Sequence, residues 1–429
     1  MPSPSSPSAQ PIIVQKFGGS SVADPEKIKH VASIIRTAHD AGHRVVAVVS
    51  AMGKTTDGLV ALAKEVTSNP SGREYDMLLS TGEMVSASLM AMCLQQQGYK
   101  AIALNGQQAG IVTEDMYNRA RILDIDTSYL QQLLNDDYIV IVTGFQGVNK
   151  HNEFITLGRG GSDTSAVAVA GALKAERCDI YTDVPGVFST DPRVAPNAQK
   201  MDEIAYVEML ELARLGAKVL HPRSVEAARR WDVKVCVRST FLLEDKGTLV
   251  VDEAQLLNLT DRAIAGVACD KSQARVAVCG IPDEPGSAAR IFQRLAQEGI
   301  SVDMIIQAMG SEPNTNDIVF TVNTWDLQNA DTLLTRLKTD FGAKRIELDA
   351  DVAKVSIVGV GMIDRPGIAA DMFSAMGKAN INMKMISTSE IKISVLVDKA
   401  QADDAVRAIH DSFFIDEEQR HLVDTKLGY

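Results

Sequence analysis

The sequence is best interpreted outward from the stretch Phe154-Ile155-Thr156-Leu157-Gly158-Arg159-Gly160-Gly161-Ser162-Asp163. Residues 154–157 are typical of a short strand, and the small, apolar residues 164–173 are typical of a helix. Three glycines between them allow positive φ angles, and the exposed N–H groups at the helix start favour an anion. Arg159 suits bidentate binding of a carboxylate or phosphate. The stretch predicts an anion site, with a simple turn capped by Ser162 or Asp163 as the alternative.

A second loop of the same kind is Lys16-Phe17-Gly18-Gly19, which follows the apolar residues 12–14 and precedes an amphipathic run at residues 25–37. A lysine at this position supplies a positive charge to a phosphate while the glycine amides surround it. Two units of strand, glycine loop and helix in one chain favour a phosphate site over two unrelated turns.

Together the two loops resemble the aspartate kinases of the amino acid kinase family, in which Lys-Phe-Gly-Gly and Gly-Arg-Gly-Gly-Ser-Asp are signature features. The resemblance runs over nearly the whole chain. It implies transfer of the γ-phosphoryl group of ATP to the side-chain carboxylate of L-aspartate, the first step towards lysine, threonine and methionine. A carboxylate nucleophile is already ionised at neutral pH, so this reaction needs no general base.

Length and composition indicate a cytoplasmic protein of several domains. The 429 residues are enough for two or three domains, and 45% hydrophobic with 23% charged residues can form buried cores. A net charge of −12 argues against a nucleic-acid or membrane surface. The five cysteines include no Cys-x-x-Cys pair, which predicts neither a zinc site nor a disulfide framework. Neither a signal peptide nor a membrane span is expected.

Short β-branched runs alternate with longer helical ones over the first 250 residues. The clearest expected elements are strands at residues 45–49, 101–104, 138–142 and 180–183 and a helix at residues 76–97. This alternation indicates a layered α/β domain with a mostly parallel sheet sandwiched by helices. Ligands of such sheets bind at the carboxyl ends of the strands, so we expect the polar loops that follow the strands to line one cleft.

The C-terminal part contains an internal repeat. Residues 286–305 align without a gap to residues 367–386, an offset of 81 (367 − 286), and each copy follows a β-rich run and an Asp-x-Pro-Gly turn. The repeat resembles the ACT domain, a βαββαβ module that commonly binds amino-acid effectors. In aspartate kinases the first module is inserted in the second, so we expect the strand near residues 264–267 to belong to the second. Because ACT modules pair across chains, a homodimer or higher homo-oligomer is expected.

These patterns divide the chain into five parts, with a polar, irregular boundary expected at residues 240–262. The parts are a tail at residues 1–11, an amino acid kinase catalytic domain at 12–250, a linker at 251–263, and ACT domains at 264–345 and 346–429.

The resemblance also implies roles for individual residues in catalysis and aspartate binding. Lys16 would neutralise the transferring phosphate, and Asp163 would orient Lys16 or help to place Mg²⁺–ATP. Arg159 would hold the α-carboxylate of aspartate, and Glu83 its ammonium group. Glu83 stands at an expected helix start, where an acidic residue is usual without any ligand. Further hydrogen bonds to aspartate or phosphate oxygens are assigned to Ser50, Thr56 and Ser162.

Nucleotide and effector sites are assigned in the same way. The residues expected to contact ATP are Lys16, Phe17, Gly18, Gly19, Gly160, Gly161, Tyr181, Thr182, Asp183, Val187, Phe188, Asp191, Arg193 and Lys218, the last of which is otherwise an ordinary solvated helix residue. Effector contacts to lysine, threonine or both are expected from Asp283, Gly286, Ser287 and Gln307 in one repeat and Asp364, Gly367, Ile368 and Asn380 in the other. The sequence has no direct protein motif for a metal, so Mg²⁺ is expected to arrive with ATP.

Other interpretations fit only part of the sequence. An acetylglutamate, glutamate or uridylate kinase would share the fold, but the Gly-Arg-Gly-Gly-Ser-Asp loop with two ACT copies argues against it. A catalytically inactive amino-acid sensor would have lost Lys16 or Asp163, and both are present. Gly53-Lys54-Thr55 is not part of a Walker A loop, because valine stands where the first glycine belongs, and Gly359-Val360-Gly361 lacks the last glycine of a dinucleotide fingerprint.

Overall fold

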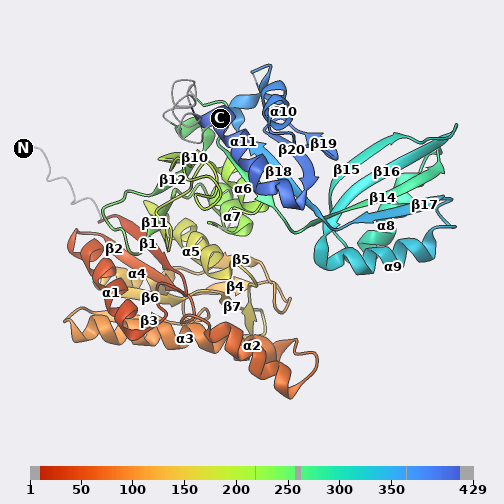
Figure 1. Cartoon of the computed structure of the whole chain (residues 1–429). Coiled ribbons are helices and arrows are strands. Elements are labelled where there is room, and N and C mark those ends of the chain that lie inside the picture. The colour runs from red at the N-terminus through yellow and green to blue at the C-terminus, as the bar shows by residue number, and fades with distance from the viewer. Residues whose placement is uncertain (1–9, 218, 257–261, 364, 416–429) are drawn as a thin grey trace, which may run out of the picture. The chain divides into compact units, whose positions relative to one another are not determined.

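The chain folds into two compact units in the computed structural model, which describes residues 10–217, 219–256, 262–363 and 365–415 (Figure 1). The first unit comprises residues 10–187, 200–214 and 219–256. The second comprises residues 188–199, 215–217 and the described residues from 262 onward. Two short segments of the stretch assigned to the catalytic domain therefore pack with the C-terminal repeat.

The first unit is built on an eight-stranded sheet in the order β10-β12-β11-β9-β1-β2-β6-β3. In that order the strands are Glu203–Ala205, Thr248–Val251, Val235–Ser239, Arg177–Thr182, Ile12–Phe17, Arg44–Val49, Ile139–Thr143 and Ala101–Leu104. Every pairing is parallel except that of β11 with β12. The apolar run of β2 is fully buried, as a strand covered on both faces requires. The predicted, mostly parallel sheet is confirmed.

Helices cover both faces of this sheet (Figure 1). α1 (Pro25–Asp40) and α3 (Arg73–Gln96) pack on one face, where Ile35, Met90 and Leu94 contact β1 and β2 in a common core. α5 (Gly161–Ala172) packs on β1, β2 and β9 and is buried along most of its length. The remaining helices of the unit are α2 (Thr55–Val66), α4 (Ser128–Asn135), α6 (Tyr206–Arg214), α7 (Pro222–Trp231) and the 3₁₀ turn η1 (Glu253–Gln255).

A second, four-stranded sheet supports the glycine-rich loop. Its order is β5-β4-β7-β8, with strands Ile122–Ile125, Ile111–Thr113, Gln146–Val148 and Phe154–Thr156. The strand and helix predicted around the loop are therefore present as β8 and α5, but β8 is not part of the main sheet. The expectation of an irregular stretch at residues 240–262 is also wrong in part, because β12 lies within it and pairs with β10 and β11.

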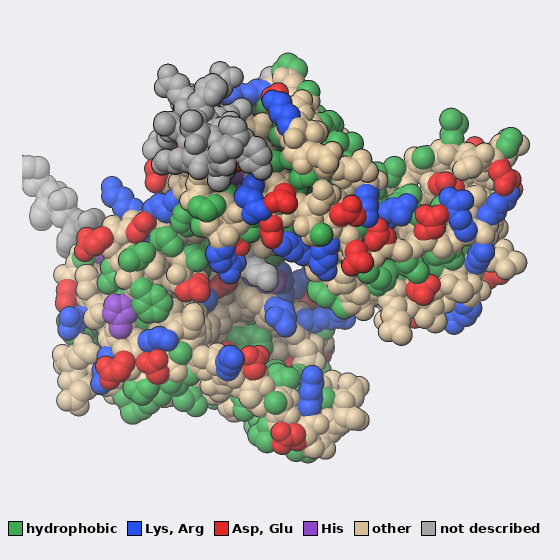
Figure 2. All heavy atoms as spheres, in the orientation of Figure 1, with side chains coloured by type: hydrophobic (Ala, Val, Ile, Leu, Met, Phe, Trp, Pro, Cys, Tyr) green, Lys and Arg blue, Asp and Glu red, His purple; other side chains and the backbone are tan. Residues whose placement is uncertain are grey.

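The long helix α3 has one buried and one exposed apolar face. Met77, Val85, Leu89 and Met92 are 51%, 51%, 36% and 54% exposed, and Figure 2 shows hydrophobic side chains along this edge of the unit. Within the described residues, α3 is the one helix long and apolar enough to cross a membrane, and half of that stretch is buried in the unit. Buried helices of globular domains meet the same criteria, so this is weak evidence for a membrane span.

The second unit contains two α/β modules, each with a four-stranded antiparallel sheet. The first has sheet order β15-β16-β14-β17 and comprises β14 (Gln273–Pro282), α8 (Ser287–Gln297), β15 (Val302–Met309), β16 (Thr315–Asn323), η2 (Thr324–Asp326), α9 (Leu327–Leu337) and β17 (Arg345–Asp349). The second has order β13-β18-β20-β19 and comprises β13 (Gly266–Asp270), β18 (Val352–Val358), η3 (Val360–Met362), α10 (Ile368–Lys378), β19 (Met385–Thr388), β20 (Lys392–Asp398), η4 (Lys399–Gln401) and α11 (Ala402–Phe414). Because β13 pairs with β18, the early strand belongs to the second module, as predicted.

Candidate active site

The two glycine-rich loops meet through an ion pair. Lys16 lies near the end of β1 and Asp163 in the first turn of α5, and their Nζ and Oδ1 atoms are 2.6 Å apart. The two side chains are only 11% and 15% exposed, so little water screens the pair. A basic group is thereby fixed beside the start of a helix, where a phosphate would collect further hydrogen bonds.

Backbone hydrogen bonds hold the loops after β1 and β2 together at the carboxyl edge of the sheet. The Ser50 N–H donates to the Phe17 carbonyl at 3.1 Å, and the Gly53 N–H donates to the Gly19 carbonyl at 3.0 Å. A Cβ atom on Gly19 would lie 2.8 Å from the carbonyl oxygen of Ala51, so only glycine permits this approach. The structure thus brings the first glycine loop and the Ser50 loop into contact, as the sheet topology predicts. Thr56 lies in the first turn of α2, directly after this loop.

Glu83 is a buried carboxylate beside the Ser50 loop. Its side chain is 3% exposed, and Oε1 accepts a hydrogen bond from the Ala51 N–H at 3.1 Å. Burial raises the pKa of Glu83 to about 7, which the Ala51 hydrogen bond only partly opposes. No residue in the described part of the chain donates to Oε2. Glu83 lies within α3, ten residues after its first residue (83 − 73), so the expected position at a helix start is wrong.

The start of α5 is open for an anion. Gly160 is the N-cap residue, with a φ of 71° and no side-chain hydrogen bond to the cap, so the alternative of a turn capped by Ser162 or Asp163 is wrong. The Gly161 N–H donates to the Gly158 carbonyl at 3.0 Å, whereas the next N–H groups of the first turn, those of Ser162 and Asp163, lack an intrahelical acceptor. Ser162 packs against Gly144, where a Cβ would come within 2.7 Å of its Oγ, and Arg159 is exposed.

We expect a Gly160→Ala substitution to lower the rate of the predicted phosphoryl transfer by about 100-fold, because the loop must move. A Cβ at this position would lie 2.1 Å from Cγ of His221, the N-cap residue of α7. Gly299→Ala is a matched control, since Gly299 has the same φ of 71° and nothing within 4 Å of a Cβ. Initial rates and thermal unfolding of the two variants separate the collision from the cost of positive φ. Equal activity of both variants would show that the loop tolerates the displacement.

The residues assigned to ATP divide between the two units. Tyr181, at the end of β9, stacks on Phe17 with ring centroids 4.8 Å apart, and the Arg238 guanidinium lies 5.7 Å from the Tyr181 ring. Thr182, Asp183 and Val187 follow in the first unit, where the Val187 N–H donates to Thr248 Oγ1 at 2.8 Å. By contrast, Phe188, Asp191 and Arg193 belong to the second unit, and Lys218 lies outside the described residues.

The candidate effector residues of the first repeat lie mostly around one turn. Asp283 accepts a hydrogen bond from the Asn316 amide at 2.6 Å, and the Ser287 hydroxyl donates to the Pro282 carbonyl at 2.9 Å. Gly286 caps α8 with a φ of 93°. Gln307 is exposed on β15, the edge strand of the sheet.

The second repeat has the same turn geometry. Gly367 caps α10 with a φ of 105°, and Ile368 is buried at the helix start. Asn380 follows the other end of this 11-residue helix, about 18 Å away along the axis, so it is not part of the same turn. Asp364 lies outside the described residues.

Two ionic side chains near the glycine-rich loop were not found by sequence reasoning. Asp76 is fully buried on α3, and Arg223 is partly buried on α7. The spacing between Asp76 and Glu83 gave one available signal, because residues seven apart share a helix face. Among the described residues, no group of three or more His, Cys, Asp or Glu side chains could hold a metal ion.

Comparison with known proteins identifies both units. Residues 11–239 match the Amino acid kinase family, and residues 276–336 and 355–413 match the ACT domain. The fold and site are therefore those of an amino acid kinase domain joined to a pair of ACT domains.

The relatives specify the kind of kinase. The aspartokinase of Geobacillus stearothermophilus is 51% identical over 95% of this chain and 98% of its own, and aspartokinase 2 of Bacillus subtilis is 48% identical over 94% and 97%. Crystal structures of E. coli aspartokinase III, one with aspartate and ADP and one with lysine and aspartate, are both 29% identical over 94% of this chain. The match includes 100% and 99% of those two chains, with TM-scores of 0.76 and 0.74. The chain belongs to the aspartokinases: it is a kinase that phosphorylates aspartate at the expense of ATP and is regulated allosterically.

Proposed function

We propose that the protein forms 4-phospho-L-aspartate at the site around Lys16 and Asp163, as the first step towards lysine, threonine and methionine. The observation that carries this proposal is the 2.6 Å contact between these two side chains, which joins both glycine loops at the first turn of α5. The E. coli neighbour that holds aspartate and ADP supports aspartate and ATP as the substrates of this protein.

In this proposal, charge and position account for catalysis. Lys16 neutralises the transferring phosphoryl group, while Asp163 holds the Lys16 ammonium in place. Gly160 and Gly161 let the loop approach the phosphate closely, and N–H groups at the start of α5 bind its oxygens. Arg159 binds the α-carboxylate of aspartate, and Glu83 binds its ammonium group, which leaves the side-chain carboxylate free to attack. Ser50, Thr56 and Ser162 donate hydrogen bonds to aspartate or phosphate oxygens.

Mg²⁺ fits this site as a partner of the nucleotide. Such an ion prefers oxygen ligands and is usually held by phosphates, water and one or two carboxylates. Asp163 offers one carboxylate beside Lys16, in keeping with a donor set that the nucleotide must complete. When bound, the ion would supply further neutralisation of phosphate charge.

Regulation is assigned to the ACT pair. We propose that lysine, threonine or both bind at the turns around Asp283 and Gly367, and that the effector stabilises a less active state. The lysine-bound E. coli neighbour supports lysine as one effector. We further propose a cytoplasmic homodimer or higher homo-oligomer formed through the ACT domains.

Aspartyl hydroxamate formation tests the function directly. With ATP, Mg²⁺ and L-aspartate we expect steady product formation, and addition of lysine and threonine, singly and together, should lower the rate. Glutamate and N-acetylglutamate as alternative acceptors serve as controls and should give no product. A folded, ATP-binding protein that forms no hydroxamate from aspartate would contradict the proposed reaction. Full activity in the presence of both amino acids would contradict only the proposed effectors.

A further inference from the structure

A buried carboxylate holds the backbone that precedes the Arg159 loop together with a second segment around residue 118. Asp76 is 0% exposed on α3 and accepts hydrogen bonds from the Thr156 N–H and hydroxyl, both at 2.8 Å, and from the Asn118 N–H at 2.9 Å. Thr156 is the last residue of β8, three positions before Arg159. Asn118 has a φ of 69°, a conformation that needs support from its surroundings.

An arginine holds the same two segments by their carbonyl groups. Arg223, in the first turn of α7, donates to the Leu157 carbonyl and to the Ala120 carbonyl, the latter at 2.6 Å. The segments are also joined directly, because the Ala120 N–H donates to the Thr156 carbonyl at 3.2 Å. Each segment is thus held once through N–H groups by a carboxylate and once through carbonyl groups by a guanidinium.

The position of residues 118–120 therefore determines where the Arg159 loop lies. A Cβ on Gly158, whose φ is 75°, would be 2.8 Å from the Asn118 carbonyl oxygen, so the two backbones are in direct contact. Arg159 follows immediately. A displacement of the Asn118 segment would be transmitted to Arg159 without an intervening flexible linker.

The contacts of position 76 require a hydrogen-bond acceptor. Its hydrogen bonds come from neutral donors, and burial raises the pKa of Asp76 despite them, so the charged form is costly in the folded protein. An apolar residue of similar volume would avoid this cost but would leave the donors on Thr156 and Asn118 without an acceptor. What only a carboxylate supplies here is several acceptor positions and no donor, which fixes three donors on two segments at once.

We propose that Asp76 and Arg223 are positioning residues that hold Arg159 in the geometry required for the α-carboxylate of the substrate. This inference rests on the proposed role of Arg159. It assigns a function in substrate affinity to two residues that touch neither aspartate nor ATP.

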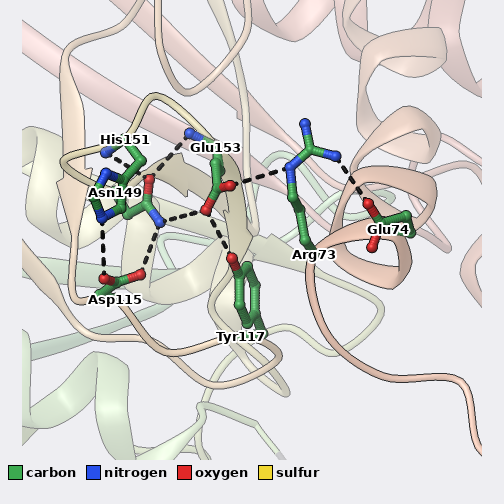
Figure 3. Close-up of polar contacts among 7 residues, drawn as sticks. All are labelled: Arg73, Glu74, Asp115, Tyr117, Asn149, His151 and Glu153. Atoms are coloured by element: carbon green, nitrogen blue, oxygen red, sulfur yellow. Dashed lines mark hydrogen bonds and ion pairs between the residues drawn. The ribbon is translucent and has the colours of Figure 1, made fainter.

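A more exposed network provides a matched control. The Tyr117 hydroxyl donates to Glu153 at 2.7 Å, and Arg73 forms an ion pair with Glu153 at 3.2 Å (Figure 3). These contacts join residues next to the same two segments, but they lie farther along the chain from Arg159. A Tyr117→Phe substitution therefore removes one link between the segments without changing Asp76 or Arg223.

The test compares Asp76→Asn and Arg223→Lys with Arg159→Ala and Tyr117→Phe by steady-state kinetics in both substrates. We expect the first two variants to raise KM for aspartate about tenfold or more, because small displacements of a binding group are costly. Their KM for ATP should stay within about threefold, and Tyr117→Phe should resemble the wild type. Thermal unfolding of each variant measures the folded fraction, and Arg223→Lys carries the test if Asp76→Asn does not fold.

Combined substitution shows whether the effect passes through Arg159. In an Arg159→Ala background, Asp76→Asn should raise KM for aspartate by less than about twofold more, since coupled residues are not additive. A lower kcat with both KM values unchanged, or full additivity of the two substitutions, would overturn the positioning role. If Arg159→Ala itself leaves KM for aspartate unchanged, the assignment of Arg159 fails first.

Discussion

Replacing Lys16 with alanine is expected to lower kcat for aspartyl phosphate formation by about 1,000-fold. The reason is electrostatic: loss of one preorganised cation beside the transferring phosphate removes its stabilisation of the transition state. Lys16 is partly enclosed, with a side chain only 11% exposed, so water cannot replace it effectively. KM for aspartate should change little, because Lys16 is assigned to the phosphate.

Two further variants identify which property of Lys16 matters. Lys16→Arg keeps the charge but not the compact shape, and should recover only part of the rate. Asp163→Asn keeps Lys16 charged but removes its 2.6 Å partner, and should lower kcat less than loss of the lysine does. Single-turnover hydroxamate assays at saturating ATP give these rates. A Lys16→Ala enzyme with more than about a tenth of wild-type kcat would contradict the catalytic role.

The apparent affinity for aspartate is expected to fall as pH is lowered through about 7. Burial raises the pKa of Glu83 from 4.5 to about 7, so below that pH the carboxyl group of the free enzyme becomes protonated and neutral. A neutral carboxyl binds an ammonium group poorly. Each further pH unit reduces the ionised fraction about tenfold, and kcat/KM for aspartate should fall with it. Measurement of kcat/KM for aspartate from about pH 5.5 to about 8.5, in steps of about half a pH unit, tests this dependence.

Glu83→Gln provides the control for this titration. It should raise KM for aspartate at neutral pH about 10- to 100-fold and remove the inflection near pH 7. Without aspartate, the free energy of unfolding should change with pH in the opposite sense. Because the folded-state pKa is raised, the wild type loses stability as pH rises from about 4.5 to about 7, and the glutamine variant does not. An inflection that persists in Glu83→Gln would assign the titration to another group.

The sequence by itself determined the alternation of strands and helices in the catalytic part and the duplication behind it. Both follow from local causes: β-branched apolar runs such as residues 45–49 form buried strands, and glycines such as Gly160 and Gly367 start helices in a backbone conformation that other residues avoid. The contact of Lys16 with Asp163 was one of two roles for Asp163 that the resemblance to the aspartate kinases implied.

Only the tertiary structure decided how the Arg159 loop is held. The residues that hold it are separated by up to 147 positions (223 − 76), and no periodicity joins them. They are Asp76, Asn118, Thr156 and Arg223. Nor could the sequence show that β8 lies in a second sheet, or that burial raises the pKa of Glu83 to about 7. These properties depend on which segments exclude water from one another, and burial of that kind arises from packing between distant parts of the chain.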